Sequence, residues 1–157
     1  MVARSVRTVK PATEARVDDR VILRVGAKIL IPFILIFALY VQFHGEYGPG
    51  GGFQAGVIFA AAFVLYALIY GLAAAFRVMP PQAAYVCGAF GVSLYLLVGF
   101  AGMALGGEFL NYNVLAHDPV HGQHYGIIAI ELGVLITVFG AMVGIFYAFA
   151  GRRRLDP

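Results

Sequence analysis

One acidic residue lies within the long apolar segments of the sequence, and its position suggests ion or proton chemistry. Glu131 stands about five residues after the start of the last apolar segment. An intramembrane carboxylate is costly unless it is paired, protonated or close to water, so such residues often serve a function. Two interpretations stay open. Glu131 takes part in an ion or proton relay or an intersubunit hydrogen bond, or it is a protonated or interfacial side chain with a local partner.

The helical position of Glu131 predicts a second surface beside it. Small residues recur along one side of the same segment, at Gly133, Thr137, Gly140, Gly144 and Ala148. Successive residues of a helix turn by about 100°, which places Glu131 on nearly the opposite side. If the small residues pack within the chain's own helix bundle, Glu131 faces out of that bundle. We therefore expect another helix, another subunit or a water-filled cavity beside Glu131, and not lipid.

A proline-glycine run precedes the second apolar segment. It consists of Pro49, Gly50, Gly51 and Gly52. The proline stops a helix that arrives from the N-terminal side, and the glycines permit a tight, left-handed backbone that other residues resist. Gly52, Gly56 and Ala60 then form a stripe of small residues with a spacing of four. Either the run is an ordinary loop before a packing helix, or at least one of its glycines has a positive φ or touches another backbone.

Three further residues complete the candidates for an ion or proton route. His44 and Glu46 precede the glycine run, where they either guide cations toward the membrane or are ordinary interfacial residues. Tyr95 lies midway along the third apolar segment, on a face that it shares with four glycines. It either fills a gap in the helix packing or finds a partner for its hydroxyl group.

Polar residues between the third and fourth segments contain a metal-like spacing but do not predict a metal site. They are Glu108, His117, Asp118, His121 and His124. His-x3-His suits a metal on a helix, but Pro119 and Gly122 interrupt such a helix and no cysteine joins. We expect a solvated loop, free to contact a partner subunit, with no metal or cofactor. The glycine run also lacks the Lys-Ser/Thr of a phosphate loop, and no active site of an enzyme is predicted.

Four apolar segments are long enough to cross a bilayer, since a helix rises about 1.5 Å per residue and the hydrocarbon core is about 30 Å thick. They are residues 21–43, 53–76, 82–105 and 126–150. The predicted fold is an all-α membrane protein with four transmembrane helices, formed by residues 21–151. Residues 1–20 are expected to be a mostly disordered tail with room for a short amphipathic piece near residues 13–24, and residues 152–157 a basic tail.

Composition and charge agree with a membrane protein. Of the 157 residues, 61% are hydrophobic and 12% are charged, which is about half the charge of a soluble domain. All basic residues lie in the N-terminal region, the short loop near residue 77 and the C-terminal tail. The positive-inside rule therefore predicts that both termini lie in the cytoplasm. We expect a multi-pass protein of the inner membrane. This distribution disfavours a nucleic-acid-binding face, and the leader is too long for a cleaved signal peptide.

The glycine run and a second patch resemble a known family. Residues 48–56, Gly-Pro-Gly-Gly-Gly-Phe-Gln-Ala-Gly, precede an alanine-rich apolar helix and are similar to the MnhB family. Its members are the MnhB subunits of the multisubunit Mrp-type cation/proton antiporters. Residues 130–134, Ile-Glu-Leu-Gly-Val, resemble the start of the family's last helix. The resemblance covers most of the chain, with one membrane helix before the glycine run and three after it.

The resemblance implies a subunit of an exchanger that moves Na⁺ or another monovalent cation against H⁺. Its partners would be large subunits similar to those of respiratory complex I, other small subunits and membrane lipid. The MnhB subunit is not the main proton pump of such complexes, so its role would be structural, with a share in the ion route. Two alternatives stay open: an MnhB-like subunit of a membrane-bound hydrogenase or related redox-driven ion pump, and a tetraspan scaffold without a transport role.

Overall fold

The computed structural model describes residues 12–46 and 48–151, and over these residues the chain is all-helical. The elements are α1 (Ala12–His44), α2 (Gly52–Tyr70), α3 (Leu72–Val78), α4 (Pro81–Ala104), the 3-10 helix η1 (Tyr112–Leu115) and α5 (Pro119–Gly151). Four helices contain segments that are long and apolar enough to cross a membrane, namely Val21–His44 of α1 and the whole of α2, α4 and α5. The predicted all-α fold with four candidate spans is confirmed.

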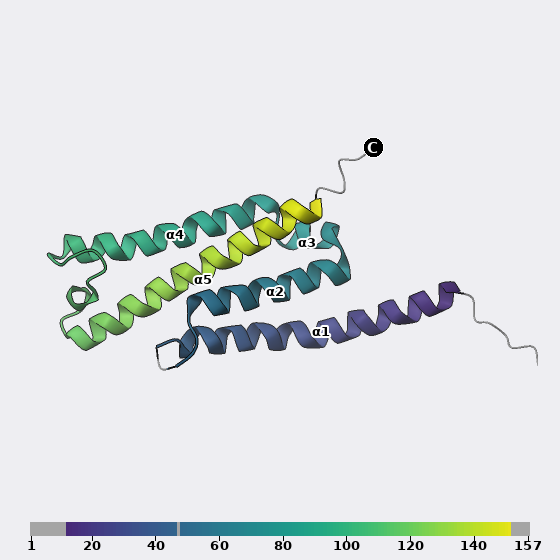
Figure 1. Ribbon diagram of the computed structural model, residues 1–157, viewed down its shortest axis with the longest axis horizontal. Helices are drawn as coiled ribbons and strands as arrows, with labels where there is room; N and C mark the ends of the chain where they lie inside the picture. The colour runs from purple at the N-terminus through teal and green to yellow at the C-terminus, as the bar shows by residue number, and fades with distance from the viewer. Residues whose placement is uncertain (1–11, 47, 152–157) are drawn as a thin grey trace, which may run out of the picture.

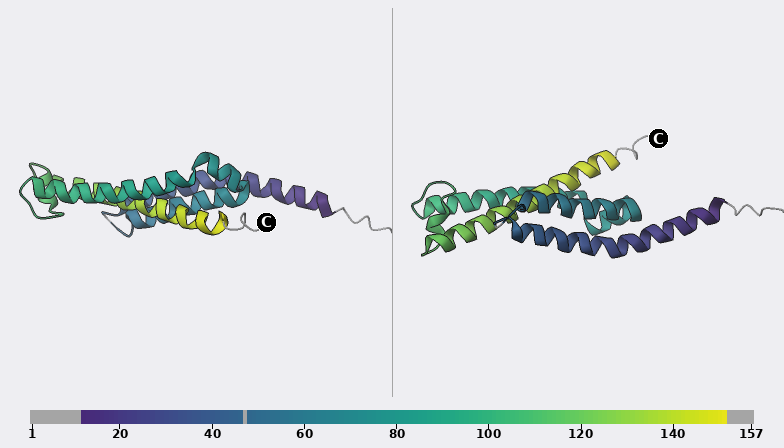
Figure 2. Two further views of the ribbon diagram at one scale, coloured as in Figure 1. Left: turned by 90° about the horizontal axis from the view of Figure 1, so that it is seen from above. Right: turned by 60° about the horizontal axis from the view of Figure 1, so that its bottom comes forward.

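The four long helices lie side by side in the order α4, α5, α2, α1 (Figure 1). α5 packs against α4 on one side and against α2 on the other, whereas α1 packs mainly against α2. The start of α1 and the end of α5 point toward the same end of the molecule, as two further views also show (Figure 2). The α1–α2 and α4–α5 connections point toward the other end. α5 and α2 are therefore the inner helices of the row.

Small residues let α5 approach both of its neighbours closely. On the side of α4, an ideal Cβ added to Gly140 would lie 2.6 Å from the carbonyl oxygen of Ala84. On the side of α2, an ideal Cβ added to Gly56 would lie 2.8 Å from the carbonyl oxygen of Leu135. Side chains do not fit at such distances, so the helices meet backbone to backbone. Close approach of this kind replaces the hydrophobic effect as the source of helix packing in lipid.

The second predicted span is wrong at its C-terminal end. The apolar run over residues 53–76 predicts one helix, but α2 ends at Tyr70 and Gly71 adopts φ 90° before α3 begins. A positive φ interrupts the helical hydrogen bonds, and apolar composition carries no sign of it. The chain then folds back onto the end of α5, where the Tyr147 hydroxyl donates a hydrogen bond to the Met79 carbonyl oxygen at 2.7 Å.

Two helix starts also differ from the prediction. Residues 12–20, expected in a mostly disordered tail, belong to α1, while the rest of that tail and the C-terminal tail lie outside the described residues. α5 begins at Pro119 and not at Gly126. Proline suits the first turn of a helix because its missing N–H would have no partner there. Gly122 lies within the helix, so the expected interruption does not occur.

Candidate functional site

The connection between α1 and α2 comprises residues 45–51. Together with Gly52, the first residue of α2, it is called the glycine turn below, and all of these residues but residue 47 are described. The backbone N–H of Gly51 donates to the carbonyl oxygen of Val41 at 3.0 Å, which draws the turn back against α1. An ideal Cβ on Gly50 would lie 2.6 Å from the same carbonyl oxygen. Gly51 adopts φ 107°, the positive φ that a run of three glycines permits. Pro49 is exposed at the outside of the turn.

The carboxylate of Glu131 lies directly against the glycine turn. An ideal Cβ on Gly45 would lie 2.6 Å from Glu131 Oε1, and one on Gly51 would lie 3.2 Å from the same oxygen. A Cβ on Gly52 would collide with the carbonyl oxygen of Glu131. Glu131 itself is half-buried. Three glycines therefore cover one side of the single acid of α5, and a side chain at Gly45 or Gly52 would force the turn or the acid to shift.

Glu131 contacts another helix, as expected, but it does not face out of the chain's own bundle. The helices form a row, so α5 has a neighbour on each side. α4 covers the side of Gly133, and α2 with the glycine turn covers the side of Glu131. Glu131 also lies 12 residues after Pro119, the first residue of α5, because the helix begins earlier than its apolar part. It is therefore farther from the helix start than the sequence indicated.

A second contact joins the glycine turn to α5. Glu46 Oε2 lies 2.5 Å from His124 Nδ1, and the two side chains are 26% and 38% exposed, respectively. His124 lies seven residues before Glu131, which places both on the same face of α5, two turns apart. The prediction of a loop at His124 is wrong because His124 lies within α5, while its side chain is still partly exposed. The spacing of seven residues between His124 and Glu131 could have indicated that they share a helix face. Glu46 is 78 residues from His124 in sequence, so no local pattern predicts that these two residues pair.

Gln42 is a polar residue of this region that the sequence analysis missed. Its side chain is 3% exposed, and its Oε1 atom has no hydrogen-bond partner among the described residues. Gln42 lies near the end of α1, three residues before Gly45, which contacts Glu131. A glutamine inside an apolar span was the signal that could have marked it. The interior of the chain is therefore polar on the α1 side of the glycine turn as well as at Glu131.

Of the remaining candidates, His44 lies at the turn but is directed elsewhere. Its ring stacks on Tyr40 with the centroids 5.0 Å apart, and it lies against Gly48. The His44 ring therefore packs within α1 and its own turn, whereas the Glu46 side chain reaches His124 of α5.

Tyr95 lies on the other side of α5. Its backbone nitrogen would be 3.2 Å from an ideal Cβ on Gly133, on the side of α5 that faces α4. Its aromatic neighbour is Tyr112 of η1, where burial raises the pKa of the Tyr112 hydroxyl and the nearby Tyr95 adds to that rise. The structure thus brings Glu131 and Glu46 to one turn and places Tyr95 apart from them.

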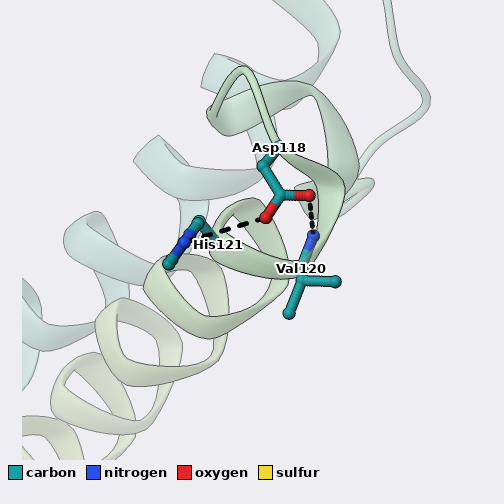
Figure 3. A network of polar contacts seen from close by, with 3 residues as sticks. All are labelled: Asp118, Val120 and His121. Atoms are coloured by element: carbon teal, nitrogen blue, oxygen red, sulfur yellow. Dashed lines mark hydrogen bonds and ion pairs between the residues drawn. The ribbon is translucent and has the colours of Figure 1, made fainter.

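The start of α5 holds the histidines that have a metal-like spacing. Asp118 Oδ1 accepts a hydrogen bond from the Val120 N–H at 3.3 Å, and Asp118 Oδ2 lies 3.7 Å from His121 Nε2 (Figure 3). An aspartate at this place satisfies an N–H group that has no partner within the helix. Over the described residues, no group of three or more His, Cys, Asp or Glu side chains is placed to hold a metal ion.

The arrangement supports ion or proton chemistry and not covalent catalysis. A carboxylate between membrane helices can bind a proton or a cation, and it is costly to keep unless it is paired, protonated or close to water. Glu46 brings a second carboxylate to the same turn. The fold and the site together define a multi-pass helical membrane protein in which one acid of an inner helix lies against the turn between α1 and α2.

Comparison with known proteins identifies the family. Residues 22–144 match the domain related to the MnhB subunit of Na⁺/H⁺ antiporters. The antiporter subunit mnhB2 of Staphylococcus haemolyticus is 33% identical over 137 residues, which cover 85% of this chain and 96% of the relative. The protein of the same name from Staphylococcus aureus (strain Newman) is 32% identical over 141 residues, covering 87% and 98%. The chain belongs to the MnhB family of Mrp-type Na⁺/H⁺ antiporter subunits, a family of transporter components and not of enzymes.

A solved structure shares the fold. The Mrp complex from Dietzia sp. DQ12-45-1b contains a chain that matches this one with a TM-score of 0.69 and 27% sequence identity. The match covers 100% of this chain and 17% of that chain, so the similar part belongs to a much longer polypeptide there. The resemblance inferred from the glycine run is confirmed.

Proposed function

We propose that this chain works as the MnhB subunit of a membrane complex that exchanges a monovalent cation, Na⁺ before others, for H⁺. Membership of the MnhB family supports this proposal, as do the names of the relatives and the Mrp complex that contains the similar fold. Its partners are the other subunits of such a complex, including large subunits similar to those of complex I, together with membrane lipid. The relatives are named as antiporter subunits, which favours this assignment over a hydrogenase-type complex.

The proposal includes an orientation in the inner membrane. Both termini lie in the cytoplasm, and the glycine turn and the α4–α5 connection lie outside. The distribution of basic residues supports this orientation through the positive-inside rule. The positions of the start of α1 and the end of α5 at the same end of the molecule are compatible with it.

The observation that supports a role beyond scaffolding is the enclosure of Glu131 by Gly45, Gly51 and Gly52. Because these residues have no side chains, the carboxylate lies against bare backbone. Carboxylate oxygens are among the ligands that hard cations prefer. We therefore place Glu131 on the cation or proton route, with the glycine turn as its structural support. The remaining helices of the row serve to hold this contact and the neighbouring subunits.

Purification in mild detergent tests the proposal. We expect mass spectrometry to identify other Mrp-type subunits with this chain, and vesicles that contain the complex to show cation-dependent proton exchange. Vesicles reconstituted without this chain should lose that exchange. Recovery of hydrogenase subunits would contradict the antiporter assignment, and unchanged exchange without this chain would favour a scaffold that transport does not require.

A further inference from the structure

We propose that His124 is a positioning residue, which holds the glycine turn closed over Glu131 through its contact with Glu46. His124 does not touch the proposed ion-route oxygens itself, and it acts on them through the turn. The expected effect of His124 on transport rests on the proposed function. The structural part of the inference, the control of access to the Glu131 carboxylate, is measured independently.

Adjacent residues of the turn make the two contacts. Gly45 faces Glu131 Oε1, and the next residue, Glu46, reaches His124 Nδ1 at 2.5 Å. On α5, Glu131 and His124 share one face and lie two turns apart, or roughly 10 Å at 1.5 Å per residue. The turn is therefore attached to α5 beyond Glu131, on the side of the helix start. Movement of Glu46 away from His124 would carry Gly45 away from the carboxylate.

Apart from the packing of its glycines on Glu131, the turn has one hydrogen-bonded tie to α5 among the described residues. Over the described part of the chain, the His124–Glu46 contact is the one hydrogen bond that joins a side chain of the turn to α5. The backbone bonds of the turn run to α1 and α2 instead, from Gly51 to Val41 and from Ala55 to Gly51. Glycine-rich backbone is also the most free to change its conformation when a tie is lost.

The contact is suited to opening and closing because both partners reach water. The His124 and Glu46 side chains are 38% and 26% exposed. Partly exposed polar contacts of this kind contribute modestly to stability, so the closed turn is favoured but not locked. A fully buried pair would instead be very costly to break. We infer that the His124–Glu46 pair sets how often the Glu131 carboxylate meets the water outside the turn.

Chemical labelling of Glu131 in the purified complex tests this role. A water-soluble carbodiimide modifies accessible carboxyl groups, and mass spectrometry of the peptide that contains Glu131 gives the rate. We expect His124→Ala to raise that rate by roughly two- to five-fold, because the pair is partly exposed and contributes modestly. Glu46→Ala should raise it by a similar factor. The double variant should add little to either single change, since both remove the same contact.

Three controls separate positioning from general loosening. His121→Ala removes a histidine one turn earlier, whose ion-pair partner is the neighbouring Asp118, and should leave the labelling of Glu131 unchanged. Glu108 is exposed in the α4–α5 connection and should label at the same rate in every variant. His124→Asn keeps a hydrogen-bonding group near the Nδ1 position and should restore most of the protection.

The outcomes are distinct. An equal rate at Glu131 in wild type, His124→Ala and Glu46→Ala would overturn the proposal. So would a rise that His121→Ala also produces, or one that Glu108 shares. If Glu131→Gln leaves transport intact while His124→Ala still exposes Glu131, the proposed ion route fails and the positioning role stands.

Discussion

At Gly45, Gly51 and Gly52, the absence of a side chain is what allows the glycine turn to rest on Glu131. In the sequence, Glu131 and the glycine run are far apart and are separate candidates. In the structure, the glycine turn packs directly against Glu131. The acid gains a backbone surface in place of lipid, which lowers the cost of keeping it between helices. A methyl group is enough to separate them.

Gly52→Ala tests this packing. A Cβ at this position collides with the carbonyl oxygen of Glu131, and overpacking of this kind costs about 1–3 kcal/mol. We expect a lower unfolding temperature of the purified protein and less assembled complex. Gly26→Ala is the matched control, because a Cβ there meets nothing within 4 Å and alanine favours a helix over glycine by about 1 kcal/mol. Equal stability of the two variants would show that the contact at Gly52 is looser than described.

At the scale of elements, the end of α5 is held by the chain that returns after α3. Tyr147 is 5% exposed, and its hydroxyl donates to the Met79 carbonyl oxygen at 2.7 Å. The same ring packs edge-on against Phe63 and Phe76. The break at Gly71 therefore has a structural role. It turns α3 toward α5, so that Phe76 and Met79 contact Tyr147 near the C-terminal end of α5.

Tyr147→Phe should weaken the contact between the end of α5 and the chain after α3. The change removes the hydroxyl and leaves the Met79 carbonyl oxygen without its donor, at a cost of about 1–3 kcal/mol for a buried group. Thermal unfolding in detergent should show a lower midpoint than wild type. Tyr85→Phe makes the same chemical change on a ring that is 64% exposed and should leave the midpoint unchanged. If both variants unfold like wild type, the hydrogen bond contributes nothing measurable.

The four membrane spans could be predicted from the sequence, but some of their ends could not, because these depend on the backbone conformation of single residues. Hydropathy located four spans because apolar length is a direct requirement of the membrane. It missed the break at Gly71, since a positive φ leaves no trace in composition, and it missed the polar first turns of α5, which begin at Pro119. Glu131 stood out as an isolated charge. The pairing of Glu46 with His124 did not, because it depends on how α1 and α5 are brought together.

At the scale of the whole molecule, the helices form a row, and over the described residues no other long helix covers the outer side of α1 or of α4. Many large apolar side chains are exposed along the row, among them Phe33 at 65%, Leu97 at 64% and Phe149 at 73%. Exposed apolar surface on this scale requires lipid or protein around it. A row is therefore a suitable shape for a protein that lies between larger partners.

Reporter fusions test the proposed orientation of this row. A fusion at residue 115, in the α4–α5 connection, should report the outside. A fusion at residue 155, in the C-terminal tail, should report the cytoplasm, because basic residues favour that side. The opposite result at either site would refute the orientation.

The most direct test of the central claim is proton exchange by vesicles that carry the complex with Glu131→Gln or Glu131→Ala. Glutamine keeps the shape that contacts Gly45 and Gly51 and removes the titrating group, whereas alanine also removes the packing. If Glu131 lies on the ion route, Glu131→Gln should assemble normally and lower cation-dependent proton exchange by at least about ten-fold, which corresponds to about 1.4 kcal/mol. If packing alone matters, Glu131→Gln should be nearly silent and Glu131→Ala should reduce assembly. Normal exchange by both variants, with complex of normal composition, would contradict the account.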